Sequence, residues 1–116
     1  MNLTPKELKD LMVQEVQNYI EFLKEVYQHL GDDHPTSKDV LERSEDLEGS
    51  FLSYYDSEDA EDFSTADHCR FLLEEESDYC SGLALSSDLE ESVVELIEEK
   101  ASHIQNLLDD LSSEFD

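Results

Sequence analysis

The stretch TPKELKDLMVQEVQNYIEFLKEVYQHLG, residues 4–31, has the features of one long helix from end to end. Thr4 suits the N-cap position, Pro5 suits the first helical position, and Glu7 completes a capping box with Thr4. Gly31 suits the position just past the last helical residue. The sequence therefore predicts a helix over about 5–30.

Apolar side chains recur between these caps at alternating spacings of four and three residues. This spacing is typical of a helix that packs lengthwise on its neighbours. At about 1.5 Å per residue, such a helix is ~39 Å long. The predicted buried seam comprises Met12, Val16, Tyr19, Leu23, Val26 and Leu30.

Working outward, the next segment predicts a shorter helix over about 37–55, capped by Thr36 or Ser37. Gly49 lowers the helix propensity of its middle. Residues 56–63 carry too many acids and too few apolar side chains to form a packed helix, so we expect a loop there.

Two more helices are indicated further along the chain. Ser64 begins a helix over about 65–81, and Ser87 with Glu90 forms a capping box before a long helix over about 88–114. The long helix has a second apolar seam with the spacing of the first. That seam comprises Val94, Ile97, Ala101, Ile104, Leu108, Leu111 and Phe115.

The fold class expected from these patterns is all-α. No alternating strand pattern of useful length occurs, and glycine and proline total only five residues. We expect residues 1–116 to form a single acidic domain, a compact bundle of about four helices. The two long seams could alternatively pair across a homodimer, and both arrangements stay open.

The charge is the most unusual property of the chain. Asp and Glu number 32 against 7 Lys and Arg, which gives a formal net charge of -25. Residues 1–31 hold five acids and three lysines, a net charge of -2, so the remaining segments carry nearly all of it. The first helix is therefore predicted to be a scaffold.

The acids gather in the tract YYDSEDAEDF (residues 54–63), in EEESD (residues 74–78) and at the C-terminus. We expect the second and third groups to lie at helix C-termini, where negative charge opposes the helix dipole. Departures from local stability rules of this kind favour a functional role. The candidate partner-binding residues are Asp56, Glu58, Asp59, Glu61, Asp62, Glu74, Glu75, Glu76, Asp78, Asp109, Asp110, Glu114 and Asp116.

Most of the few bases outside the first helix are expected to be paired internally. Arg43 has Asp39 and Asp46 at helical spacing, and Arg70 has Asp67 and Glu74 at helical spacing. Lys100 has no acid three or four residues away, so we expect it to reach another helix or to extend toward solvent.

Carboxylates along a rigid helical rod can present charge similar to that of a nucleic-acid backbone. Duplex DNA carries about one negative charge per ~1.7 Å, and its binding proteins meet it with Lys and Arg. In composition, size and expected helices the chain resembles the acidic DNA-mimic inhibitors that phages and mobile elements direct against restriction enzymes, CRISPR effectors and other host DNA-binding proteins. The resemblance implies a cytoplasmic inhibitor whose partner is a basic DNA- or RNA-binding protein.

Two alternatives use the same composition. The chain could be an immunity protein or assembly chaperone for a basic toxin or nuclease, or its acids could be an adaptation to salt or a means of solubility. The aromatic residues Tyr54, Tyr55 and Phe63 fit the anchors of a protein interface, but they fit core positions as well.

The sequence contains no motif typical of an enzyme or of a cofactor-binding protein. No phosphate-binding loop or nucleophile elbow occurs, so we expect neither catalysis nor a cofactor. The tract after Asp56 approaches a calcium loop but has Glu61 where the sharp turn requires Gly, so we expect no metal site. Cys69 and Cys80 fall about 16 Å apart along one helix, too far for a disulfide.

Membranes and free nucleic acids are not expected as partners. No apolar run reaches the ~18 residues that a membrane span requires. The net charge of -25 would also repel anionic lipid and the phosphates of a nucleic acid.

Overall fold

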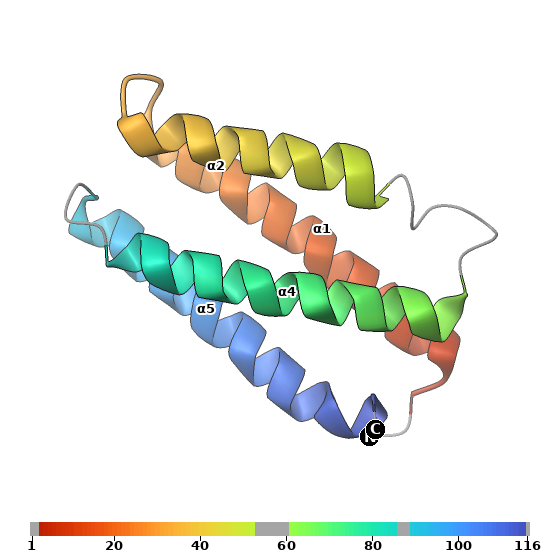
Figure 1. Ribbon diagram of the computed structural model, residues 1–116. Helices are drawn as coiled ribbons and strands as arrows, with labels where there is room; N and C mark the ends of the chain where they lie inside the picture. Colours follow the sequence, from red (N-terminus) through yellow and green to blue (C-terminus); the bar gives the residue numbers. More distant parts are fainter. Residues whose placement is uncertain (1–2, 53–60, 86–88, 116) are drawn as a thin grey trace.

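A computed structural model describes residues 3–52, 61–85 and 89–115 of the chain (Figure 1). It shows an all-α helical bundle, and the described ranges contain no strand. The elements in chain order are α1 (Pro5–Leu30), α2 (Pro35–Asp46), η1 (Leu47–Leu52), α4 (Asp62–Ala84), α5 (Glu91–Leu111) and η2 (Ser112–Glu114).

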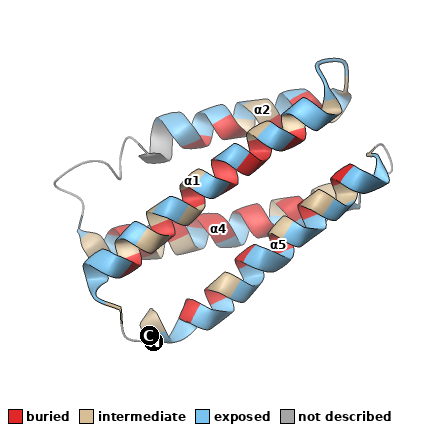
Figure 2. Cartoon of the chain, turned by 180° about the vertical axis from the view of Figure 1, so that it is seen from behind, coloured by how far each residue is buried: buried red, intermediate tan, exposed pale blue. Residues whose placement is uncertain are grey.

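The helices form two layers. α2 and α4 lie in the layer facing the viewer of Figure 1, whereas α1 and α5 face the viewer of Figure 2. α4 packs against both α5 and α1, and α1 also packs against α2. Leu3, before α1, and Glu114, in η2, meet at one end of the bundle, where the Leu3 N–H donates to the Glu114 carboxylate at 3.3 Å.

The core lies between these layers, and its residues appear as red bands on the inner helix faces in Figure 2. The predicted α1 seam is confirmed from Met12 to Val26, while Leu30 is only half-buried. Ile20 and Phe22 are buried as well, because α1 has neighbours on more than one side. The seam of α5 is confirmed at Ile97, Ala101, Ile104, Leu108 and Leu111.

The ends of α1 are the predicted ones. Thr4 Oγ1 accepts from the Glu7 N–H at 3.2 Å, and the Glu7 carboxylate accepts from the Thr4 N–H at 3.1 Å. Gly31 follows the last turn with φ of 81°, which favours glycine, and its N–H donates to the Tyr27 carbonyl.

The start of α2 corrects the sequence prediction. His34 caps the helix, with Nδ1 accepting from the Thr36 N–H at 3.1 Å, and Pro35 is the first helical residue. Ser37 is buried and its hydroxyl donates to the His34 carbonyl at 2.7 Å. α2 therefore starts at residue 35 and not at the predicted 37, because the backbone angle that the proline ring fixes in Pro35 suits the first helical position.

After Asp46, the helix widens into the π-helical segment η1. Gly49, which the sequence marked as a weak point of the helix, lies in this segment. The predicted helix over 37–55 is therefore α-helical only to Asp46, and its last residues lie outside the described ranges.

α4 is longer than predicted at both ends. It begins at Asp62, within the stretch expected to be a loop, and no side-chain bond caps it at Glu61. Burial of Thr65 and Ala66 at the first turns stabilises this early start. At the other end, Leu83 and Ala84 pack against the core, so the helix continues through Gly82.

α5 begins three residues later than predicted and ends before 114, with η2 after it. Its first core residue is Val93, 3% exposed, instead of Val94. The predicted cap at Ser87 lies outside the described ranges. Among the helices of the described ranges, none is long and apolar enough to cross a membrane.

Candidate functional site

The first acidic tract is described only at its end. Asp56, Glu58 and Asp59 lie outside the described ranges. Glu61 is exposed beside the start of α4, and the half-buried Asp62 forms an ion pair with Lys9 of α1 at 3.5 Å.

The structure brings the second and third acidic groups together. α4 and α5 lie side by side, and Glu74, Asp78 and Asp109 line one groove between them with Arg70 and Gln105. The Gln105 amide donates to the Ser77 hydroxyl at 2.5 Å, which ties the two helices together at this groove. Glu74, Asp78 and Asp109 therefore form one acidic face although they are far apart in the sequence.

The remaining predicted acids lie around this face in different ways. Glu75 and Asp110 are exposed. Glu114 is half-buried and holds the Leu3 N–H, so part of its hydrogen-bonding capacity is used inside the fold. Asp116 lies outside the described ranges.

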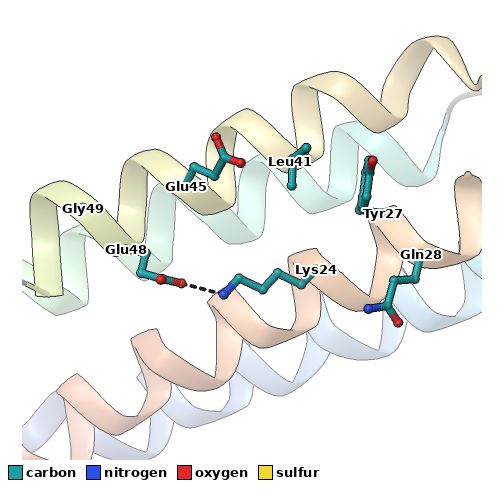
Figure 3. A pocket seen from close by; sticks show the side chains of 7 residues that line it. All are labelled: Lys24, Tyr27, Gln28, Leu41, Glu45, Glu48 and Gly49. Carbon is teal, nitrogen blue, oxygen red and sulfur yellow. Dashed lines mark hydrogen bonds and ion pairs between the residues drawn. The ribbon is translucent and has the colours of Figure 1, made fainter. Parts of the chain in front are cut away.

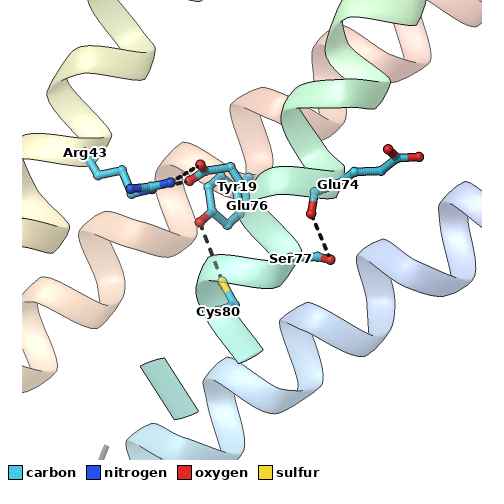
Figure 4. A network of polar contacts seen from close by, with 6 residues as sticks. All are labelled: Tyr19, Arg43, Glu74, Glu76, Ser77 and Cys80. Atoms are coloured by element: carbon cyan, nitrogen blue, oxygen red, sulfur yellow. Dashed lines mark hydrogen bonds and ion pairs between the residues drawn. The ribbon is translucent and has the colours of Figure 1, made fainter. Parts of the chain in front are cut away.

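The prediction that Glu76 is a partner-binding surface residue is wrong, because its side chain is buried. Its side chain is 3% exposed and accepts two hydrogen bonds from Arg43 of α2, from Nε and from Nη2, both at 2.6 Å (Figure 4). Arg43 therefore pairs with α4 and not with Asp39 or Asp46 as the spacing suggested. The guanidinium also lies 3.9 Å from the centroid of the Tyr79 ring.

A buried polar network surrounds this ion pair. Tyr19 of α1 lies beside Glu76, and its hydroxyl is 3.5 Å from Cys80 Sγ (Figure 4). Burial raises the pKa of Tyr19 well above its ordinary value and also raises the pKa of the Cys80 thiol. The pKa of Arg43 is raised by its hydrogen bonds to Glu76. Cys69 and Cys80 are both buried and are not joined by a disulfide.

The position of the EEESD residues within α4 is a second correction. α4 continues to Ala84, so Glu74, Glu75 and Asp78 lie in the second half of the helix and not in its last turn. The unfavourable effect of the helix dipole falls off within the last turn and is therefore small for these acids. Asp109, in contrast, does lie in the last turn of α5.

Phe63 and Phe71 of α4 and Phe115, which follows η2, form an aromatic cluster around Arg70, and the sequence indicated it only in part. The Arg70 guanidinium lies 4.8 Å from the ring centroid of Phe71 and 4.9 Å from that of Phe115. The rings of Phe63 and Phe115 are 6.2 Å apart and tilted by 52°. Asp67 accepts from both Nε and Nη2 of Arg70, at 3.0 and 2.7 Å, which confirms that predicted pair.

A further groove, of about 630 Å³, lies between α1 and the α2–η1 segment (Figure 3). Lys24 reaches across it to Glu48 at 2.6 Å, and Glu45 of α2 is one of the residues that line it. Its one cation is therefore already paired across the groove. Throughout the described residues, no group of three or more His, Cys, Asp or Glu side chains is placed to hold a metal ion.

Fold and surface together define a class, a strongly acidic helical bundle with carboxylates from α4 and α5 meeting on one face. Comparison with protein-family models, curated proteins and solved structures finds no match to the chain.

Proposed function

We propose that the protein is an acidic inhibitor that imitates DNA and occupies the basic groove of a nucleic-acid-binding protein. The main support for this proposal is the net charge per unit length of the molecule. The molecule is 43 Å long and has a net charge of -25, on the order of one charge per 2 Å, against one per ~1.7 Å in duplex DNA. A groove built for one of these charge distributions would attract the other.

The positions of the bases support the proposal. Lys9, Lys24, Arg43 and Arg70 each form an ion pair with an acid of the same chain. Lys100 lies over the ring of Phe22 at 5.8 Å, on another helix, as one of its two predicted arrangements required. The four ion pairs neutralise individual carboxylates, and the acids remain in large excess over the bases, so a partner meets a strongly negative molecule.

Competition is the mechanism that these features favour. Electrostatic steering would speed the encounter with a basic partner, and the bundle would then exclude DNA from the groove that it fills. The carboxylates of α4 and α5 are carried on packed helices, so binding does not require the backbone that presents them to fold first. No reaction is required, and inhibition would be stoichiometric.

The test is a competition experiment on the immobilised protein. Lysate of the source organism or its host is passed over it at physiological salt, and bound protein is eluted with duplex DNA or with about 0.5 M salt, at which charge interactions are strongly screened. The expected result is a basic DNA- or RNA-binding protein that is released by both. Its DNA binding should then be lost at a one-to-one ratio in a gel-shift assay.

Other outcomes reject the mimic. A retained partner that DNA does not displace would favour an immunity protein or assembly chaperone. Failure to retain a basic protein, together with unfolding at low salt, would favour adaptation to salt.

A further inference from the structure

The aromatic cluster of Phe63, Phe71 and Phe115 around Arg70 leaves two large apolar side chains exposed to solvent. Phe71 is 51% exposed and Phe63 is 40% exposed. The two rings belong to one cluster. The Arg70 guanidinium contacts the rings of Phe71 and Phe115, and the ring of Phe115 contacts that of Phe63. Exposed aromatic rings grouped around an arginine are typical of the anchors of protein interfaces.

The cluster is continuous with the acidic face. Phe63, Asp67, Phe71, Glu74 and Asp78 follow one another at spacings of three and four residues and so share one stripe of α4. Arg70 belongs to the aromatic cluster and also lines the groove that holds Glu74, Asp78 and Asp109. An apolar centre therefore adjoins a carboxylate-rich rim.

The cluster is held in place before any partner binds. Asp67 accepts from both Nε and Nη2 of Arg70, which holds the guanidinium close to the rings of Phe71 and Phe115. Phe115 packs in turn against the core. Binding at this cluster would immobilise few additional side chains, which favours affinity.

We propose that Phe63, Phe71 and Phe115, arranged around Arg70, anchor an amphipathic basic segment of a partner protein. Apolar side chains of that segment cover the rings, and its Lys and Arg side chains meet Glu74, Asp78 and Asp109. Charge complementarity selects the occupant, because this rim repels nucleic acid and anionic lipid and attracts a basic protein. The inference rests on the proposed function and adds to it an apolar contact that a phosphate backbone does not offer.

Two synthetic peptides of equal length and equal Lys and Arg content test it. One carries a leucine stripe beside its basic residues, and the other has glutamine in place of each leucine. Fluorescence anisotropy at physiological salt measures both affinities. The wild-type protein should bind the leucine peptide about tenfold more tightly, a difference of the size that interface anchors produce.

The variant F63S/F71S should remove this preference and leave the affinity for the glutamine peptide unchanged. Both rings are substantially exposed, so the substitutions should spare the fold, which thermal unfolding checks. The matched control is L85S at the end of α4, where Leu85 is 86% exposed and not in the cluster. L85S should keep the full preference.

The peptide experiment distinguishes failure of the aromatic anchor from failure of the proposed function. Equal affinity of the wild-type protein for both peptides, or loss of the preference in L85S as well, would overturn the aromatic anchor and leave the electrostatic proposal standing. Failure to bind either peptide would overturn both.

Discussion

At the residue scale, the ion pair Arg43–Glu76 links α2 to α4, two helices that each pack against α1. Glu76 is 3% exposed, and its two oxygens are both occupied by one guanidinium. A carboxylate in that position would be strongly destabilising without its partner. The acid run EEESD therefore contains one residue that belongs to the core and three that lie on the surface.

Replacing Arg43 tests this assignment. R43M leaves Glu76 buried without its partner, and we expect the free energy of unfolding to fall by about 3 kcal/mol, the lower end of the range for broken buried pairs because Arg43 is partly exposed. R43K keeps the charge but loses the paired geometry, so its loss should be smaller. Urea denaturation measures both, and an unchanged midpoint in R43M would contradict the assignment.

Tyr19 and Cys80 give the fold a dependence on alkaline pH. Burial raises both pKa values in the folded state, whereas the unfolded chain ionises near the ordinary values of 10.0 and 9.0. Above about pH 9 the unfolded state therefore binds fewer protons than the folded state, and the free energy of unfolding falls as pH rises. Urea denaturation between about pH 8 and 10.5 should show this decline.

The variants Y19F and C80A assign the decline to its groups. Y19F removes the tyrosine contribution and should give a shallower slope, and C80A should move the onset toward the ordinary pKa of tyrosine. A slope in Y19F as steep as in the wild-type protein would reject the role of Tyr19.

At the element scale, two threonines with the same capping signal in the sequence have different roles in the structure. Thr4 caps α1 through its hydroxyl, whereas Thr36 is not the cap of α2 because His34 is. T4A should lower the free energy of unfolding by about 1 kcal/mol. T36A, the matched change at the rejected cap, should have little effect, and equal losses in chemical denaturation would restore the sequence assignment.

Neutralising the exposed acids of α4 should raise stability, whereas breaking the buried pair Arg43–Glu76 should lower it. Glu74 and Asp78 are like charges at i and i+4, a pair that costs ~0.2 to 0.5 kcal/mol. The variant E74Q/E75Q/D78N should therefore raise the thermal midpoint slightly and weaken binding of the leucine peptide. Adding E76Q should reverse the gain in stability, and a further rise would show that Glu76 is not paired in solution.

At the scale of the whole molecule, the net charge acts on folding and on binding in opposite directions. Between about 0.01 and 1 M salt the screening length falls from ~30 to ~3 Å. The repulsion within the chain weakens, so the thermal midpoint should rise, while affinity for a basic peptide should fall. A midpoint that stays level across this range would mean that the surface acids do not repel one another appreciably.

The sequence by itself determined the class of the fold, because periodic apolar seams and capping residues are local signals that each helix carries in its own residues. It located α1 closely, placed most of the α5 seam in the core and identified Asp67 as the partner of Arg70. These assignments depend on spacings within one helix, which the chain fixes before any helix meets another.

Only the tertiary structure decided the long-range contacts. It placed Glu76 against Arg43, extended α4 beyond its local signals, and brought Asp109 beside Glu74 and Asp78. Each result depends on which helices become neighbours. The packing of α4 against both α1 and α5 sets that choice by burying apolar side chains whose partners lie far away in the sequence.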